Sequence, residues 1–384
     1  MTYLLISDCY YPSKKSISRH IYDLLKKISS KNKTVDFYFP ITGKYQKTSH
    51  HYSIRNINFF PIRVNDFKKR NFFIRGVSEL ILPFIMWKKI KKNEKKIKQI
   101  IIFSPSIFFG LIMKALKKKF NCKIILLLRD VFPDWLMQKN KYLWANPFFL
   151  FAKYISFFQF YKSDVIAAQS LNDKIVLKKR FPKKKIKLIY NWITPKKLFL
   201  TSQKKKKNLN FVFVGTMGPA QNWNNIIELI KKLNENKLKF NFYFIGDGKK
   251  KIILKNQLSN FSNVHFINPL PEEKLLKRLK SMDVGIISLD DKIKFNNIPG
   301  KFFSYLESGL PILLDANSSQ EISQIIKNNK IGLTNKKNEN NLFFNAKKFI
   351  NNNGKLKSIN QNYNLILNKM FSTDFAYKQL IEKY

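Results

Sequence analysis

Short apolar runs alternate along this chain with stretches in which apolar residues recur at helical spacing. The runs have the length of buried strands, and the stretches between them have the period of amphipathic helices. Strands are expected at residues 3–6, 35–39, 57–61, 100–103, 123–128 and 165–168, and again at 211–215, 240–245, 264–267, 284–288 and 312–315. This alternation predicts an α/β protein with two parallel sheets, each covered by helices on both faces. Such sheets bind ligands beyond the carboxyl ends of their strands.

The chain has 384 residues, which is long for one domain and sufficient for two. Residues 195–208 contain the run KKKK without any periodicity, and they are predicted to be a linker. A Rossmann-like N-terminal domain is therefore expected at 1–194 and a Rossmann-like C-terminal domain at 209–365. The last stretch, 366–384, is helical in pattern and is expected to pack back on the N-terminal domain.

The stretch 295–315, FNNIPGKFFSYLESGLPILLD, has the pattern of a loop, a helix, a turn and a strand. Pro299 suits the first helical turn, and Gly309 suits the end of the helix. Lys301 stands in the first turn, where a cation opposes the helix dipole, so its presence indicates a neighbouring anion such as a diphosphate. The alternative is a solvated lysine in a lysine-rich protein.

Basic residues outnumber acidic ones by 72 to 24, and the formal net charge is +48. Such a charge is typical of proteins that bind nucleic acid or an anionic membrane surface. Lys, Asn, Ile and Phe are abundant while Gly is scarce, a bias typical of A+T-rich coding sequence, so the charge alone does not identify a partner. No recognised nucleic-acid module accompanies it, and specific nucleic-acid binding is not expected.

Residues 70–98 form an apolar and aromatic half followed by a lysine block. This pattern suits a helix that lies on a membrane with its lysines at the lipid headgroups. The side chains expected to insert are Phe72, Phe73, Leu80, Ile81, Phe84 and Trp87. The alternative is an ordinary core helix with a solvated tail. Residues 143–160 are interrupted by polar residues and are expected to form a buried or interfacial helix, not a transmembrane one.

Cys9 and Cys122 adjoin apolar runs and are expected to be buried free thiols in a reducing compartment. The first residues have neither a basic leader nor a cleavage site, so they are expected to form a strand and not a signal peptide. The histidines are scattered without zinc spacing. No dinucleotide-binding glycine motif follows a strand and no phosphate-binding P-loop motif occurs, so a dinucleotide oxidoreductase or a P-loop kinase has no support.

Several motifs carry a family resemblance. In the C-terminal half they are GDG at 246–248, PLPE at 269–272 and PGKFFSYLESGLP at 299–311. These resemble the retaining glycosyltransferases of family 4. In the N-terminal half, the segments RDVFPDW at 129–135, AAQS at 167–170 and YNWI at 190–193 are similar to the branch that adds an amino sugar, such as N-acetyl-L-fucosamine, in bacterial O-antigen or capsule assembly. The resemblance covers nearly the whole chain and implies the GT-B fold, two facing Rossmann-like domains with an interdomain cleft.

In such enzymes the C-terminal domain holds a nucleotide-sugar donor and the N-terminal domain holds a lipid-linked acceptor. The donor-binding residues that the resemblance implies are Gly215, Thr216, Gly218, Gln221, Asn222, Gly246, Asp247, Gly248, Pro269, Leu270, Pro299, Gly300 and Ser304. Lys301 and Arg129 would stabilise the departing diphosphate, and Asp130 would orient the acceptor or the sugar. The alternative for Arg129 and Asp130 is that they merely pair. The UDP-sugar is a substrate, and the resemblance implies no cofactor and no bound metal.

The chain also departs from the family pattern. Two family glutamates are replaced by Asn296 and Ser304. The family arginine after the first strand of the C-terminal domain is Thr216, and the lysine that follows it is Gln221 or Asn222. These departures make the two cations named above the main candidates for contact with the diphosphate.

The expected function is the retaining transfer of a sugar, an N-acetylated deoxyhexosamine, from a UDP-sugar to a polyprenyl-diphosphate-linked saccharide in O-antigen or capsule synthesis. The expected location is the cytoplasm, in peripheral association with the anionic inner face of the plasma membrane. Two alternatives remain, a UDP-sugar 2-epimerase of the same architecture and a non-catalytic basic protein that binds nucleic acid. Sugar interconversion without an acceptor would indicate the first, and tight, salt-sensitive nucleic-acid binding would indicate the second.

Overall fold

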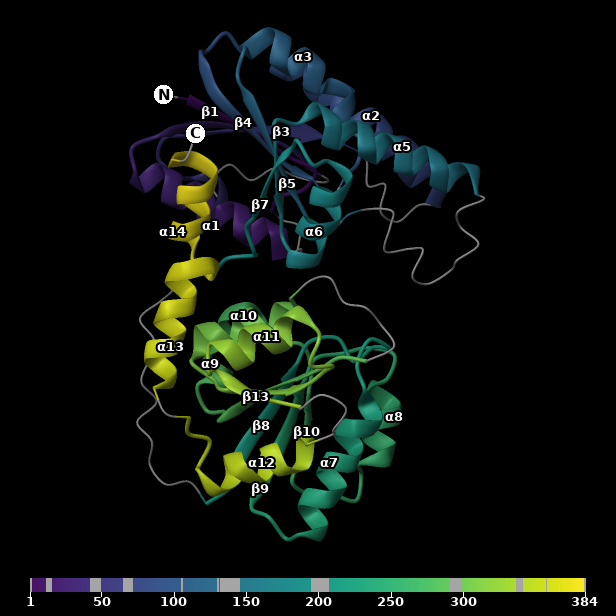
Figure 1. Ribbon diagram of the computed structural model, residues 1–384, viewed down its shortest axis with the longest axis vertical. Coiled ribbons are helices and arrows are strands. Elements are labelled where there is room, and N and C mark those ends of the chain that lie inside the picture. The colour runs from purple at the N-terminus through teal and green to yellow at the C-terminus, as the bar shows by residue number, and fades with distance from the viewer. Residues whose placement is uncertain are drawn as a thin grey trace. The chain divides into compact units, whose positions relative to one another are not determined.

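The computed structural model divides the chain into two compact units, and each has its own parallel sheet (Figure 1). Unit 1 consists of Met1–Thr194 and Met370–Tyr384, and unit 2 consists of Pro195–Lys369. The residues that the structure describes are 2–11, 16–41, 50–64, 72–104, 106–129, 131, 146–194, 207–290, 298–335, 341–356 and 358–382. Most of the predicted linker, Asp130 and Asn296 lie outside these residues.

The sheet of unit 1 has the strand order β3-β2-β1-β4-β5-β6-β7, and every neighbouring pair is parallel. Its strands are β1 (Thr2–Ser7), β2 (Thr34–Ile41), β3 (Ile57–Arg63), β4 (Ile97–Ser104), β5 (Lys123–Leu128), β6 (Val165–Ala168) and β7 (Lys185–Leu188). The central strands are apolar on both sides, since helices cover both faces. The order reverses between β1 and β4, which is where a sheet of this kind opens for ligands.

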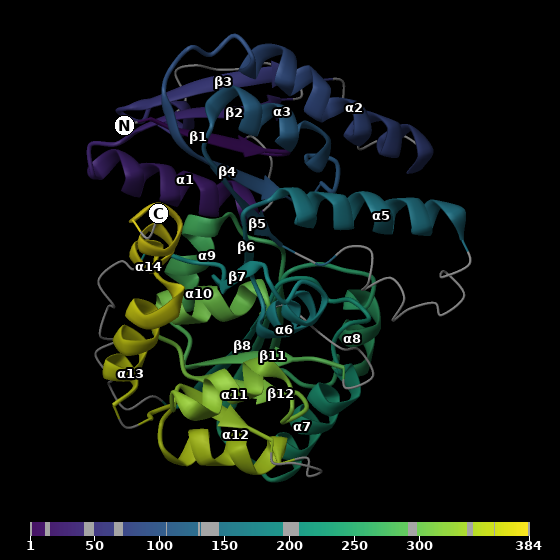
Figure 2. The same ribbon diagram turned by 45° about the horizontal axis from the view of Figure 1, so that its top comes forward.

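The helices of unit 1 form two layers (Figure 2). They are α1 (Ser16–Ser30), the 3-10 helix η1 (His50–Tyr52), α2 (Phe72–Ile90), α3 (Gly110–Phe120), α5 (Pro147–Lys162), α6 (Leu171–Arg180), α14 (Thr373–Tyr377) and the π-helix η5 (Lys378–Glu382). The apolar stripe of α1 packs on one face together with α14 and η5. Helices α2, α3, α5 and α6 cover the other face.

The last segment of the chain belongs to unit 1. A parallel bridge pairs Ile193 with Ser372, and Lys27 of α1 forms an ion pair with Asp374. The buried side chain of Gln99 donates from Nε2 to the carbonyl of Leu380 at 2.7 Å. These contacts make residues 370–382 part of the wall around the first sheet.

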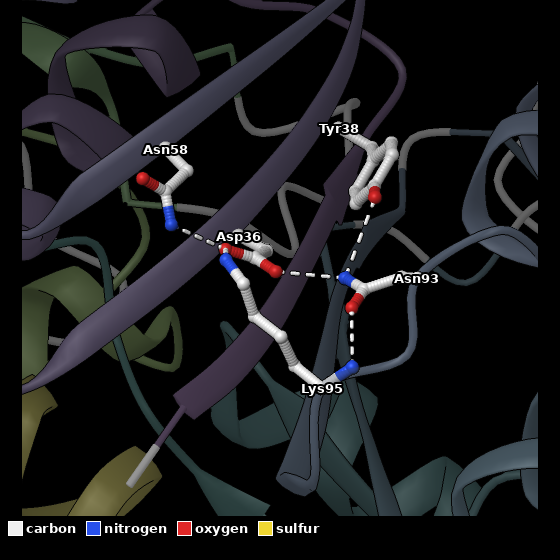
Figure 3. A network of polar contacts seen from close by, with 5 residues as sticks. All are labelled: Asp36, Tyr38, Asn58, Asn93 and Lys95. Atoms are coloured by element: carbon white, nitrogen blue, oxygen red, sulfur yellow. Dashed lines mark hydrogen bonds and ion pairs between the residues drawn. The ribbon is translucent and has the colours of Figure 1, made fainter.

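Asp36 on β2 is a fully buried carboxylate in unit 1 (Figure 3). Asn58 donates to its Oδ1 at 2.6 Å, and Asn93 donates to its Oδ2 at 2.7 Å. Lys95 completes the set with an ion pair of 2.9 Å to Oδ1. A buried charge is tolerated only when it is paired and hydrogen-bonded, and here three donors from β3 and the α2–β4 connection meet that need. Because these donors join neighbouring elements at the amino ends of the strands, the network is structural.

Unit 2 repeats the architecture with the strand order β10-β9-β8-β11-β12-β13, again all parallel. Its strands are β8 (Leu209–Val214), β9 (Phe240–Ile245), β10 (Val264–Ile267), β11 (Val284–Ser288), β12 (Ile312–Asp315) and β13 (Gly332–Thr334). Its helices are α7 (Trp223–Glu235), α8 (Lys251–Gln257), α9 (Glu272–Leu279), α10 (Gly300–Ser308), α11 (Glu321–Asn328), α12 (Leu342–Asn351) and α13 (Ile359–Ile366). The π-helix η4 (Leu367–Phe371) follows, and the division between the two units falls within it, after Lys369. Helices α7, α8 and α12 share one apolar cluster with the sheet, and α9 packs beside α10 (Figure 1).

The predicted class, two Rossmann-like α/β units, is confirmed, and every predicted strand appears. The strands β7 and β13 were not predicted. Both are short edge strands, whose half-exposed side chains give no apolar run.

Three local predictions are wrong. The helix expected over 70–98 ends at Ile90, because the chain turns there to begin β4 at Ile97. Pro299 is the N-cap of α10 and not a residue of its first turn. Cys122 is a free thiol as expected but is only partly buried, whereas Cys9 is buried. None of the described helices combines the length and the apolar character needed to cross a bilayer.

Candidate functional site

The strand order of unit 2 reverses between β8 and β11, so the loops after these two strands flank a switch point. Gly215 directly follows β8, and Ser288 is the last residue of β11. Most of the predicted donor-binding residues lie in the loops at this carboxyl edge or at the start of α10. The structure therefore brings them to one edge of one sheet.

The loop after β8 and the loop after β9 are locked together by their backbones. The amide of Met217 donates to the carbonyl of Asp247 at 2.8 Å, and the amide of Lys250 donates to the carbonyl of Met217 at 3.0 Å. Gly246 has a φ of +153°, and a Cβ on it would lie 2.0 Å from the carbonyl oxygen of Gly215. Gly248 has a φ of +147°, and a Cβ on it would lie 2.4 Å from the carbonyl oxygen of Met217. Only glycine fits both demands, so these residues set the shape of the loop pair.

The other residues of these loops differ in their surroundings. The side chain of Gln221 accepts from the amide of Gly218 at 3.1 Å, and that of Asn222 accepts from Asn225 as the N-cap of α7. Both residues thus shape the loop after β8. Thr216, Pro269 and the Asp247 side chain are exposed, and Leu270 and Ser304 are half-buried.

Helix α10 is attached to the sheet by one buried hydroxyl. The Tyr305 hydroxyl lies 3.0 Å from the carbonyl oxygen of Val212 and 3.1 Å from that of Ile286, and it accepts from the amide of Val214 at 3.1 Å. The ring lies over Gly285, where a Cβ would come within 2.5 Å of it. Burial raises the pKa of the Tyr305 hydroxyl, so the group stays protonated and serves as both donor and acceptor. This anchor fixes the start of α10 beside the ends of β8 and β11.

Lys301 stands in the first turn of α10 and folds back over β8. Its ammonium nitrogen lies 3.7 Å from the centroid of the Phe213 ring, and its Cε lies 3.8 Å from where a Cβ of Gly215 would be. Burial lowers the pKa of Lys301 from 10.5 to about 7. Among the described residues, no carboxylate pairs with this ammonium group and no oxygen accepts a hydrogen bond from it. A cation at a helix N-terminus can contact a bound anion together with the free amides of the first turn.

A second buried carboxylate, Asp315 at the end of β12, organises the neighbouring strand ends. The Ser288 hydroxyl donates to its Oδ2 at 2.8 Å, and Asn225 of α7 donates to its Oδ1 at 3.0 Å. The same Ser288 oxygen accepts from the amide of Asn222 at 3.1 Å. Asp315 therefore connects β11, β12 and the start of α7. Neither Ser288 nor Asp315 was predicted as a site residue. Each is a polar residue at the end of a predicted strand, and that position could have indicated them from the sequence.

In unit 1, Arg129 follows β5 at the carboxyl edge of the first sheet and lies near His20 of α1. Burial, with the nearby charges of Arg129 and Arg19, lowers the pKa of His20 to about 3, so this histidine is neutral at physiological pH. Trp192 packs on His20 with 5.6 Å between the ring centroids and donates from Nε1 to the His20 carbonyl at 2.9 Å. Asp130 lies outside the described residues, so its predicted role stays a prediction.

The chain is similar to known glycosyltransferases. Residues 196–364 match the family described as glycosyl transferases group 1. A curated relative, the probable glycosyltransferase WbjE of Pseudomonas aeruginosa, is 22% identical over 279 residues, which is 69% of this chain and 68% of the relative.

Solved structures match the chain as a whole. The apo form of the lipopolysaccharide outer core galactosyltransferase WaaB has a TM-score of 0.67 at 12% identity and covers 100% of both chains. The fold is of the GT-B type. Anabaena HepE, solved in complex with UDP-glucose, has a TM-score of 0.62 at 11% identity over 99% of this chain and 98% of its own. The family match and the curated relative support a glycosyltransferase.

Proposed function

We propose that this protein transfers a sugar from a UDP-sugar donor to a polyprenyl-diphosphate-linked saccharide, with retention at the anomeric carbon. The observation that carries the proposal is the position of Lys301 in the first turn of α10, beside the strand ends of the β8/β11 switch point and without a carboxylate partner among the described residues. A diphosphate is the anion that this place in a group 1 glycosyltransferase domain would bind.

The donor diphosphate would contact both Lys301 and the backbone at the start of α10. The amides of Gly300 and Lys301 belong to the first turn, where a helix leaves its amides without intrahelical acceptors. Gly300 has nothing within 4 Å of the place where a Cβ would be, so a phosphate oxygen can approach its backbone. The nucleoside would extend toward Pro269 and Leu270, where the resemblance puts the base.

The chemistry would be dissociation of the donor followed by attack from the same face. The bond from the anomeric carbon to the diphosphate oxygen breaks, and the acceptor hydroxyl forms the new bond on the face that the diphosphate leaves. The proton of that hydroxyl passes to the departing phosphate. Lys301 would offset the negative charge that grows on the diphosphate, a role strengthened by exclusion of water. Arg129 is the second candidate cation, and Asp130 would orient the acceptor or the sugar.

The finer parts of the proposal rest on the motifs of the N-terminal half. Those motifs favour an N-acetylated deoxyhexosamine as the transferred sugar and a product used for O-antigen or capsule. A polyprenyl acceptor is anchored in a bilayer, so the protein would work in the cytoplasm, at the inner face of the plasma membrane. The basic surface suits that location, since anionic lipid attracts Lys and Arg.

The test is UDP release from a panel of UDP-sugars, with and without a polyprenyl-diphosphate saccharide acceptor. Acceptor-dependent release with one donor, together with a product whose anomeric configuration matches that of the donor, would support the proposal. Interconversion of the sugar without an acceptor would replace it with an epimerase. Absence of release with every donor, in a protein that binds no UDP, would overturn the proposed donor site.

A further inference from the structure

Large apolar side chains are exposed along one face of α2. Val77, Ile81 and Phe84 are each more than two-fifths exposed, and their spacing of four and three residues puts them in a single stripe. Lys88, also exposed, continues the same stripe one turn further. Leu80 and Trp87, which the sequence pattern placed in the inserting face, instead pack against the interior of unit 1. The side chains of Phe72 and Phe73 lie outside the described part of the chain.

Helix α5 has a second exposed apolar face. Its exposed residues are Phe148, Leu150, Phe151, Tyr154 and Tyr161, of which Phe148 is 69% exposed and Tyr154 is 68% exposed. The opposite face is buried through Phe149, Ile155 and Phe160. A helix that is apolar on both faces has no face suited to water, and a large exposed apolar face of this kind marks a binding surface.

Helices α2 and α5 pack on the same part of unit 1. Leu80 of α2, Leu111 of α3 and Ala152 of α5 pack against a single buried cluster made of Ile107, Phe108 and Ile155. Figures 1 and 2 both show α2 and α5 on the same side of unit 1. We call the exposed apolar residues of these two helices the α2–α5 surface.

The charges around this surface are basic. Helix α5 contains no acidic residue, and Lys162 lies 5.2 Å from the ring centroid of Phe158 and 5.4 Å from that of Tyr161. Lys184 lies 5.7 Å from the Tyr161 ring. Helix α2 ends in Lys88 and Lys89. A second copy of the chain would bring these lysines against lysines, whereas an anionic bilayer offers both a hydrocarbon layer and a negative headgroup layer.

We propose that the α2–α5 surface docks on an anionic lipid bilayer. The two helices lie in the plane of the interface, with Ile81, Phe84, Phe151 and Tyr154 inserted among the acyl chains and the lysines at the headgroups. Helix α5 has 16 residues, about 24 Å of helix, which suits a helix lying along the interface. This inference rests on the proposed work at a membrane and adds the surface that makes the contact.

The experiment is flotation of the full chain with vesicles of phosphatidylglycerol or of phosphatidylcholine. Wild-type protein is expected to float with the anionic vesicles and to be released as salt is raised, because headgroup attraction is screened. The variant Ile81→Ser, Phe84→Ser, Phe151→Ser, Tyr154→Ser is expected to lose at least about tenfold in affinity. Its matched control is Ile252→Ser with Phe344→Ser, two residues of unit 2 that are 73% and 67% exposed. The control is expected to float like wild type.

Equal flotation of the quadruple variant and wild type would overturn the inference. The inference would also be overturned if light scattering showed that the wild-type protein is a dimer and the quadruple variant a monomer, because the surface would then pair copies of the chain. Far-ultraviolet circular dichroism and the melting temperature would show that the variant is folded. Transfer to a short-chain acceptor in detergent is expected to be unchanged in the variant. If the wild-type protein floats but transfers no sugar, the proposed function is contradicted and this surface is not. If it transfers sugar but does not float with anionic vesicles, the surface is contradicted and the proposed function is not.

Discussion

The ammonium nitrogen of Lys301 lies 3.7 Å from the centroid of the Phe213 ring. A cation at the start of α10 therefore packs on an aromatic ring near the carboxyl end of β8. The ring favours the charged form, while burial opposes it and lowers the pKa of Lys301 to about 7. A lysine with this pKa is poised to gain a proton when an anion binds beside it.

Nucleotide-sugar binding is therefore expected to depend on pH. The diphosphate would bind the protonated form of Lys301, so affinity for a UDP-sugar should fall as pH rises through about 7. Binding should also take up as much as about one proton near pH 8, because the bound anion raises the pKa of Lys301. Calorimetry in buffers of different ionisation enthalpy would measure both effects. An affinity that stays constant from about pH 6 to about pH 9 would contradict this assignment.

Replacement of Lys301 by alanine is expected to lower sugar transfer on the order of 100-fold while the fold stays intact. The matched control is Lys231→Ala on the exposed side of α7, which should change nothing. Wild-type turnover in the Lys301 variant would remove this residue from the site.

The same lysine affects stability. The unfolded chain keeps the proton up to about pH 10.5, whereas the folded chain loses it near 7, so its contribution to the free energy of unfolding rises with pH between these values. In Lys301→Met this contribution should disappear. Denaturation curves of the two proteins at several pH values would show it, and parallel pH dependences would contradict it.

Two glycines near the site should respond in opposite ways to alanine. Gly246→Ala places a Cβ 2.0 Å from the Gly215 carbonyl oxygen at a φ of +153°, and should lower the free energy of unfolding by at least about 2 kcal/mol. Gly300→Ala meets nothing within 4 Å and lies in a helix, so it should raise that free energy by about 0.5–1 kcal/mol.

Gly300→Ala is also expected to weaken UDP-sugar binding several-fold, since its methyl group would stand where the phosphate approaches. A stabilised protein with reduced donor affinity would assign Gly300 to binding. Unchanged affinity, measured by calorimetry, would place the diphosphate elsewhere.

Loss of the Asp315 carboxylate should loosen the edge of the second sheet. Asp315→Ala leaves the buried Ser288 hydroxyl and the Asn225 amide without this acceptor, which is expected to cost about 2–4 kcal/mol. Hydrogen exchange should increase at the amide of Asn222, which depends on Ser288. The control Asp247→Ala removes a side chain that is 71% exposed and should change stability by less than about 0.5 kcal/mol. Unaltered exchange at Asn222 would show that the network does not hold this loop.

Tyr305→Phe removes the hydroxyl that connects α10 to β8 and β11. The amide of Val214 then lacks its partner, and the expected cost is about 1–3 kcal/mol. Because the start of α10 is released, KM for the donor should rise more than kcat falls. Tyr243→Phe is the control, since among the described residues nothing is hydrogen-bonded to that hydroxyl. A stability loss with unchanged KM would make Tyr305 structural only.

The sequence pattern was sufficient to locate the strands, but it was not sufficient to tell which face of α2 is buried. Periodicity locates β5 and β9 to the residue, because buried strands between polar turns are short apolar runs. In α2 apolar residues occur all around the helix, so spacing alone did not separate the partly buried Trp87 from the exposed Ile81 and Phe84. That distinction comes from the neighbours α3 and α5, which are remote in sequence.

In the candidate site, too, local features could be predicted from the sequence and contacts between distant elements could not. The helix start at Pro299, the glycines and Lys301 are visible as a motif, because their roles depend on local backbone. The partnership of Asp315 with Ser288 and Asn225 is not visible, because it joins three elements far apart in the chain. Asp36 is a parallel case in unit 1, where an acidic residue inside an apolar strand is explained only by donors from two other segments.

The return of the chain from unit 2 to unit 1 at Met370 has a consequence for biosynthesis. The whole of unit 2 is synthesised before the residues that pair with Ile193 and Lys27 are made. Of the two units, the first-made is therefore the last to be completed, and one face of its sheet stays without α14 until Thr373–Tyr377 has been made. The nascent first half would depend on a chaperone or on the ribosome surface to shield that face.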